Sequence, residues 1–373
     1  MKANRFGRLS AVALVAAGAL ALSACGSDNA TNTGAGATSS ASGPKVTGTL
    51  TGTGSSAQAS AVDAWKQGFT QANPGVTVQY SPDGSGAGRK TFISGASQFA
   101  GSDAAMSTEE LTSAKAVCGA DGALDLPVYI SPIAVTFNVS GVKELNLTAD
   151  TIAKIFRGQI TKWNDPAIAA DNSGVSLPDL KITPVHRSDD SGTTQNFTDY
   201  LAKAAPSVWT DKSSQTWPAS LPGENAKGTS GVVKTVTDTQ GAFAYADDSA
   251  VSGSLGKAKI KVGDKFVALS AEGAAKAVEL SKPADGRAAN DLALSLNRTL
   301  TDSSAYPIVL VSYHIVCTAY KDQATVDLVK AWENYVASDA GQKAAAAAAK
   351  SAPISSALAA KVKTAVDSIK VKS

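Results

Sequence analysis

The sequence LPVYISPIAVTFNV, residues 126–139, is the longest stretch of β-forming residues in the chain. It is long for a strand that stays within one domain, so it predicts a strand that crosses from one domain into another. A similar run, YPIVLVSYHIVC at residues 306–317, comes near the end of the chain. Two crossings predict that one domain is built from both ends of the chain and that the middle forms the other.

Short apolar runs alternate with helical patterns on both sides of these crossings, which indicates an α/β fold. The predicted first lobe combines residues 48–131 and 312–373, and the predicted second lobe is 132–311. Two helices, expected over about 324–336 and 341–348, return to the first lobe.

The residues RSDDSGTT, 187–194, bring a guanidinium, hydroxyls, carboxylates and a glycine into one turn. The preceding residues predict a strand and the following ones the opening of a helix. The first N–H groups of a helix lack intrahelical partners and its dipole favours negative charge, so this loop suits an anion. Arg187 adds a planar, permanently charged fork that suits a tetrahedral oxyanion. A structural role is the alternative, in which Asp190 or Ser191 caps the helix and Arg187 pairs with Asp189.

Three earlier loops have the same polar, small-residue character. The loops 52–57 and 81–88 each lie between a predicted strand and a predicted helix, and so offer hydroxyls and N–H groups at helix starts. The third, at residues 99–103, is a short run that ends in the carboxylate of Asp103. Taken alone, Asp103 also fits a residue that satisfies a turn.

The start of the chain predicts export. Basic residues precede an apolar run at 9–22, which is too short to span a bilayer but is typical of a signal peptide. The residues LSAC, 22–25, resemble a bacterial lipobox. We therefore expect a signal peptide over 1–24 and a lipidated Cys25 that begins a flexible tether over 25–47. The expected location is the extracytoplasmic face of the cell membrane, with a lipid anchor.

Charge and cysteine content exclude several classes of protein. Loss of residues 1–24 removes three positive charges and no negative ones, so the net charge of +2 becomes −1. No basic cluster suggests nucleic acid as a partner. The histidines, His186 and His314, have no second ligand at zinc spacing, so we expect no metal and no cofactor. Two cysteines remain, Cys118 and Cys317, beside the two crossings, and an isolated extracytoplasmic pair predicts a disulfide.

Five motifs in order carry a resemblance to a known family. They are TGTGSS (51–56), GSGAG (84–88), GSD (101–103), IFRGQITKWNDP (155–166) and RSDDSGT (187–193). Together they resemble the phosphate-binding protein of bacterial high-affinity phosphate ABC transporters, over essentially the whole mature chain. The resemblance implies a type II periplasmic-binding-protein fold, with two α/β lobes joined by two crossing strands. It also implies a monomer that binds inorganic phosphate in the cleft and delivers it to a membrane ABC permease.

The resemblance also implies which residues contact the ligand. They are Ser55, Ser56, Ala57, Ser85, Asp103, Arg187, Ser191, Gly192 and Thr193, with Asp189 orienting the arginine. The family often has threonine and phenylalanine where this chain has Ser56 and Ala57, and whether Ser55 or Ser56 supplies the first-loop hydroxyl stays open.

The presence of Asp103 predicts that this site distinguishes between oxyanions. Phosphate keeps at least one proton near neutral pH, whereas sulfate keeps none, so a carboxylate acceptor admits a protonated oxyanion and repels a bare one. Two alternatives remain open: a binding protein for another tetrahedral oxyanion, such as sulfate or molybdate, and a hydrolase that uses Ser191 with His186 or His314 as base. No G-x-S-x-G pattern surrounds a candidate serine, which disfavours the hydrolase.

Overall fold

The structure, a computed structural model, describes residues 46–373, so the expected signal peptide, Cys25 and most of the tether lie outside the described residues. The first sheet combines both ends of the described chain, in the strand order β2-β1-β3-β13-β4. The strand β1 is parallel to β2 and β3, and β13 is antiparallel to β3 and β4. The bounds are β1 Gly48–Gly54, β2 Val76–Ser81, β3 Phe99–Ser102, β4 Ala123–Phe137 and β13 Val309–Cys317.

The strand β4 belongs to both sheets. Residues 123–132 of this strand pair with β13, and residues 133–137 pair with β8 (Ala242–Asp247). All 15 residues of β4 are buried, and a strand covered on both faces has a nearly continuous run of apolar residues. That is the pattern of residues 126–139, and the crossing expected there is confirmed.

The second sheet continues from β4 in the order β4-β8-β6-β7, and β9 pairs with β4, β5 and β10. The strand β6, which ends at Arg187, is parallel to both of its neighbours. The polar residues 187–194 therefore begin where β6 and both of its neighbours have their carboxyl ends. The bounds are β5 Glu144–Leu147, β6 Thr183–Arg187, β7 Glu224–Ala226, β9 Gly256–Val262 and β10 Lys265–Val267.

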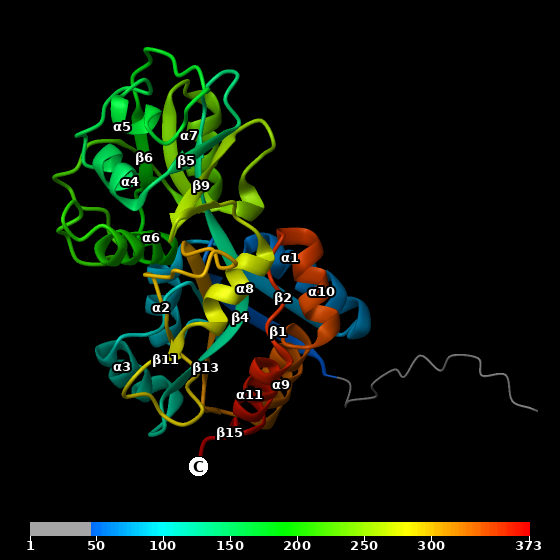
Figure 1. The fold of residues 1–373 in the computed structure, drawn as a ribbon. Coiled ribbons are helices and arrows are strands. Elements are labelled where there is room, and N and C mark those ends of the chain that lie inside the picture. Colours follow the sequence, from blue (N-terminus) through cyan, green and yellow to red (C-terminus); the bar gives the residue numbers. More distant parts are fainter. Residues whose placement is uncertain (1–45) are drawn as a thin grey trace, which may run out of the picture. The chain divides into compact units, whose positions relative to one another are not determined.

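Helices cover both sheets (Figure 1). In α1, residues Ala61, Val62, Trp65 and Phe69 are buried, which is the spacing of one helix face. The bounds are α1 Ala59–Ala72, α2 Ser85–Ile93, α3 Thr108–Cys118, α4 Ala149–Phe156, α5 Pro166–Ala169, α6 Gly192–Ala204, α7 Gly228–Asp238, α8 Ala271–Glu279, α9 Gln323–Val336, α10 Asp339–Ala349 and α11 Ser356–Asp367. The two helices expected near the end of the chain are thus found as α9 and α10. Within residues 46–373, no helix has the length and apolar character needed to cross a membrane.

The disulfide predicted from the sequence is confirmed. It joins Cys118, the last residue of α3, to Cys317, the last residue of β13, across a sequence separation of 199 residues. Both residues are buried. The bond therefore ties the first half of the chain to its last quarter.

The segment that follows α8 contacts residues of the predicted first lobe, although it falls within 132–311. It contains a hairpin of β11 (Lys282–Pro283) and β12 (Leu294–Ser295). In the loop between these strands, Arg287 Nη1 donates to Asp125 Oδ2 (3.2 Å) and Nη2 donates to the Met106 carbonyl (2.7 Å). The sheets show which strands belong together, and the lobe bounds themselves stay a prediction.

Candidate ligand-binding site

The carboxylate of Asp103, just after β3, is the point where the polar loops meet. Its Oδ1 accepts hydrogen bonds from Ser55 Oγ (2.5 Å) and Ser312 Oγ (2.8 Å), and its Oδ2 accepts one from Thr193 Oγ1 (3.0 Å). Its backbone N–H donates to Ser85 Oγ (3.1 Å). The structure thus brings together four of the predicted ligand-contacting residues from loops far apart in the sequence.

The buried position of Asp103 affects the pKa of its carboxyl. The residue is buried. Burial raises the pKa of Asp103, and the three hydroxyls and the charge of Arg187 lower it without cancelling the effect of burial. The hydroxyl donors thus favour the ionised, hydrogen-bond-accepting form of this carboxyl, and burial opposes it.

Arg187, at the end of β6, is held in a fixed orientation by Asp189. Nε donates to Asp189 Oδ1 (2.7 Å) and Nη2 donates to Oδ2 (2.5 Å), while Nη1 takes part in neither bond. Asp189 Oδ1 also accepts from the Gly228 N–H (3.1 Å). Burial alone would raise the pKa of Asp189, but the hydrogen bonds and charge of Arg187 and the Gly228 N–H lower it below its usual value. Arg187 and Asp189 therefore form a bidentate ion pair.

The first turn of α6 lies against Asp103. Ser191 caps this helix, since its Oγ accepts from the Thr194 N–H (3.1 Å). A Cβ on Gly192 would lie 2.6 Å from Ser85 Oγ and 2.7 Å from Asp103 Cβ. Only glycine therefore permits this approach, which places the N–H end of the helix beside the buried carboxylate.

The two serines of the first loop point to different partners. Ser55 Oγ donates to Asp103 and also accepts from the Ala57 N–H (3.0 Å). Ser56 Oγ lies 3.0 Å from Thr229 Oγ1 and accepts from the Thr229 N–H (3.1 Å). The hydroxyl of Ser55 therefore belongs to the cluster around Asp103, and that of Ser56 joins the start of α7.

Sequence reasoning missed two hydroxyl residues at this site, Ser312 and Thr229. Ser312 is a buried polar residue within the apolar strand β13, and that isolation was its only signal. Thr229 lies in the sequence KGTSG, another set of small polar residues at a helix start. Their positions depend on how distant segments pack, which the local pattern does not contain.

The histidines lie outside the cluster of hydroxyls. His186 Nδ1 lies 2.9 Å from the Arg187 carbonyl, and its ring stacks on Trp217. His314 lies between Glu333 Oε2 (2.8 Å) and Gln58 Oε1 (3.2 Å). In the described part of the chain, neither imidazole is hydrogen-bonded to Ser191, and the Ser191 hydroxyl caps α6 instead. This geometry therefore gives no support to the hydrolase. No three His, Cys, Asp or Glu side chains within residues 46–373 are grouped to hold a metal ion.

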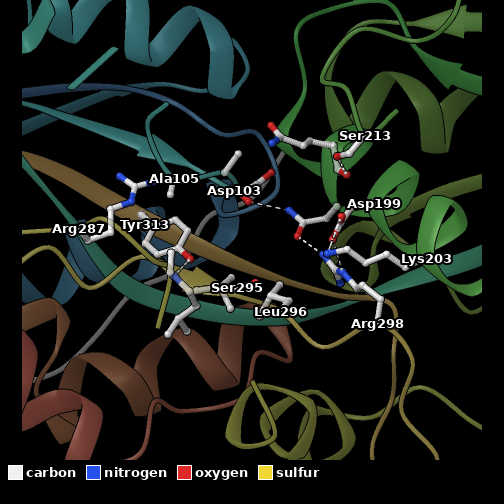
Figure 2. Close-up of a pocket in the computed structure, with 16 residues that line it drawn as sticks. Asp103, Ala105, Asp199, Lys203, Ser213, Arg287, Ser295, Leu296, Arg298 and Tyr313 are labelled. Carbon is white, nitrogen blue, oxygen red and sulfur yellow. Dashed lines mark hydrogen bonds and ion pairs between the residues drawn. The ribbon is translucent and has the colours of Figure 1, made fainter. Parts of the chain in front are cut away.

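A cavity of about 300 Å³ borders the site at Asp103 (Figure 2). Polar side chains line much of it, including Asn196, Asp199, Arg287 and Arg298. The residues Ser55, Arg187 and Thr193 are not among those that line it. The cavity is therefore a neighbour of the hydroxyl cluster and not the cluster itself.

Two α/β lobes that share one long strand, with polar strand-to-helix loops converging on a buried carboxylate, define a two-lobed binding protein. The profile of the PBP superfamily domain matches residues 30–340. "Phosphate-binding protein PstS 3" of Mycobacterium leprae is 39% identical over 341 aligned residues, and the match covers 89% of this chain and 90% of that one. "Phosphate-binding protein PstS 2" of Mycobacterium tuberculosis is 38% identical over 340 aligned residues, and the match again covers 89% and 90% of the two chains. The chain belongs to the family of these phosphate-binding proteins.

A solved structure agrees on the fold. It is that of a high affinity periplasmic phosphate-binding protein bound with phosphate at pH 8.5. The TM-score is 0.68 at 21% identity, and the match covers 85% of this chain and 93% of the other. The expected class of fold, with mixed α/β lobes, is therefore confirmed.

Proposed function

We propose that this chain is an extracytoplasmic solute-binding protein that captures inorganic phosphate between its two lobes and delivers it to a membrane ABC permease. Family membership supports the ligand and the transport role. The observation that carries the proposal is the buried Asp103 carboxylate, which accepts hydrogen bonds from three hydroxyls beside the first turn of α6.

The chemistry of these residues favours a phosphate ion. Hydroxyls and helix-start N–H groups hold a buried dianion with dipoles that are already oriented, and Arg187 adds one full positive charge. The proposed ligand contacts are those expected from the sequence: Ser55, Ser56, Ala57, Ser85, Asp103, Arg187, Ser191, Gly192 and Thr193, with Asp189 orienting Arg187. The hydroxyl of Ser312 is a further candidate, because it bonds the same carboxylate.

The role proposed for Asp103 is to accept a hydrogen bond from a protonated oxygen of the ligand. Phosphate carries at least one proton near neutral pH and sulfate carries none. Phosphate can donate a hydrogen bond to the buried carboxylate, whereas sulfate would place a negatively charged oxygen against it. A buried acceptor without a donor costs free energy, so sulfate should bind less well.

Titration calorimetry on protein stripped of phosphate tests the ligand directly. Phosphate, sulfate and molybdate are titrated at fixed pH and salt. We expect saturable binding of phosphate and far weaker binding of the other two anions. Tighter binding of sulfate or molybdate would replace phosphate with that anion and overturn the role given to Asp103.

The lipid anchor at Cys25 is part of the same proposal and rests on the sequence of the lipobox. Wild-type protein is expected in the membrane fraction, with lipid mass on the mature N-terminus. Cys25→Ser should abolish both, whereas Ser27→Ala, two residues into the tether, should abolish neither. Membrane attachment of the Cys25→Ser protein without lipid would point to another anchor.

A further inference from the structure

We propose that Asn196 and Arg298 are positioning residues of the anion site, which hold the backbone of Asp103 against the first turn of α6. Neither residue is among the proposed ligand contacts. The inference rests on the proposed function, because its readout is phosphate binding. It predicts that affinity and selectivity depend on a hydrogen-bonded network behind the site as well as on the ligand contacts.

The side-chain amide of Asn196 joins the two backbone segments that flank the site. Nδ2 donates to the carbonyl of Asp103 (2.6 Å) and to the carbonyl of Gly192 (3.0 Å). One NH₂ group thus fixes the residue that carries the carboxylate relative to the residue that begins α6. A loss of this group would free both carbonyls and relax their separation.

Arg298 holds Asn196 in turn. Its Nη2 donates to Asn196 Oδ1 (2.5 Å) and its Nε donates to Asp199 Oδ2 (2.9 Å). The guanidinium therefore binds two residues on one face of α6. Figure 2 shows Arg298 beside Asp199, with a chain of dashed lines that leads back to Asp103. The amide can therefore present its NH₂ group to the two carbonyls in one orientation only.

The same guanidinium also reaches the strand that carries Ser312. Arg298 Nη1 donates to the carbonyl of Val309, the first residue of β13, at 2.7 Å. Three residues further along β13, Ser312 donates to Asp103 Oδ1. Arg298 therefore links the two residues that hold Asp103: Asn196 bonds its backbone carbonyl, and Ser312 bonds its side chain. A planar donor fork is the side chain best suited to link acceptors from separate segments in this way.

A second buried asparagine supplies a matched control. Asn172 is 5% exposed and Asn196 is 6% exposed. Asn172 Nδ2 also bridges two carbonyls, those of Asn146 and Ile168, at 2.8 Å each. It lies beside α5 and β5 and outside the anion site. Truncation at either position removes the same buried amide, so a general loss of packing should affect both variants alike.

The experiment compares Asn196→Ala with Asn172→Ala. For wild type and both variants, thermal unfolding is measured without phosphate, and the Kd values for phosphate and sulfate are measured at one pH and salt. We expect both variants to lose stability. We expect Asn196→Ala alone to weaken phosphate binding by roughly tenfold or more and to shrink the preference for phosphate over sulfate, because one buried hydrogen-bonded bridge is lost.

The outcomes separate the positioning role from the proposed function. If Asn196→Ala keeps the wild-type phosphate Kd and selectivity while its stability falls with that of Asn172→Ala, the network is structural only and the inference is wrong. If wild type itself prefers another anion, the proposed function fails and the inference fails with it. Should Asn196→Ala not fold, Arg298→Lys keeps the charge but loses the fork, and the same two readouts decide.

Discussion

Three hydroxyls converge on the Asp103 carboxylate from three separate segments, those of Ser55, Thr193 and Ser312. A hydroxyl can turn its proton toward a carboxylate or toward a ligand, and its oxygen can accept as well. The cluster can therefore redistribute its hydrogen bonds around an oxyanion without exposing a buried charge. Arg187, already oriented by Asp189, needs no such freedom.

The substitution Asp103→Asn should reduce selectivity more than affinity. The asparagine amide keeps one acceptor oxygen. The substitution removes the negative charge, however, and adds an NH₂ donor that suits a fully ionised anion. We expect a modest loss of phosphate affinity and a reduction of the phosphate-to-sulfate preference by about 1 to 3 kcal/mol. Calorimetric titration of both anions measures this ratio. Asp125→Asn, at a buried carboxyl bonded to the Met106 N–H, is the control. An unchanged ratio with both affinities lowered would make Asp103 a structural turn residue.

A second buried carboxyl, Asp247, should make stability depend on pH. Its Oδ1 accepts from Tyr129 and Ser249, and within the described residues its Oδ2 has no hydrogen-bond partner. Burial raises the pKa of Asp247 to about 7. The unfolded chain releases this proton near pH 4 and the folded chain does not, so the free energy of unfolding falls as pH rises from about 4 to about 7.

The variant Asp247→Asn should remove this loss. Relative to wild type, its free energy of unfolding should rise between pH 5 and pH 8 by an amount on the order of 1 to 3 kcal/mol, since one pKa unit corresponds to about 1.4 kcal/mol. Urea denaturation of both proteins at the two pH values measures the difference. An offset between the two proteins that is the same at pH 5 and pH 8 would show that Asp247 does not titrate in this range.

At this scale, local pattern predicts some site residues and misses others. Ser55, Asp103 and Arg187 each lie in a loop next to a strand, where a run of small or charged residues is visible in the sequence. Ser312 contacts Asp103 because β13 lies between β3 and β4 in one particular register. That register is set by residues about 200 positions away, so no window of sequence contains it.

Between elements, the start of α2 contacts the loop that precedes α6. The Gly86 N–H donates to the carbonyl of Asp190 (3.0 Å), and Lys90 Nζ lies 2.8 Å from Asp190 Oδ2. Asp190 Oδ1 accepts from Thr216. The sequence offered Asp190 or Ser191 as the cap of α6, and the cap is Ser191. Asp190 instead joins α2 to the loop before α6.

The substitution Gly86→Ala should hinder this approach and leave each lobe folded. A Cβ on Gly86 would lie 2.4 Å from Asp190 Cβ, whereas alanine within the helix itself is favourable. We expect phosphate to bind at least about tenfold more weakly, if closure contributes about 1.4 kcal/mol or more to binding, with little change in the melting temperature of phosphate-free protein. Gly231→Ala, in α7, is the control, because its nearest neighbour lies at an ordinary 3.5 Å. Wild-type affinity in Gly86→Ala would mean that the contact adjusts without cost.

The elements themselves follow the sequence pattern unevenly. The strands expected before the polar loops and the helix α9 are present, because their apolar residues recur with a clear period, and α10 is present because its run of alanines favours a helix. The last helix, α11, and the short pair of β14 (Ala319–Tyr320) with β15 (Lys370–Val371) were not expected. The two strands of that pair are short and far apart in sequence, so tertiary packing and not local propensity produces them.

For the whole chain, the disulfide should contribute strongly to stability. Cys118 and Cys317 are 199 positions apart in the sequence. For a closed loop of this size, the chain-entropy model predicts a gain of about 5 kcal/mol in the free energy of unfolding. The double variant Cys118→Ser with Cys317→Ser should therefore unfold at a clearly lower urea concentration than wild type, and wild type in reductant should approach the variant. Equal midpoints for all three would show that the unfolded chain does not gain freedom when the bond is absent.

Phosphate should draw the two lobes together and stabilise the fold. The proposed contacts come from both sides, with Ser85 and Asp103 on one lobe and Arg187 and Thr193 on the other, so the closed arrangement binds the ion best. By mass action, phosphate at about 100 times its Kd should add about 2.7 kcal/mol to the free energy of unfolding. Small-angle scattering should show a smaller radius of gyration with phosphate, and thermal unfolding a higher Tm. In Gly86→Ala, where closure is hindered, both changes should be reduced together. If saturating phosphate changes neither quantity in wild type, the ion does not bridge the lobes, and the contacts between Asp103 and Thr193 form without it.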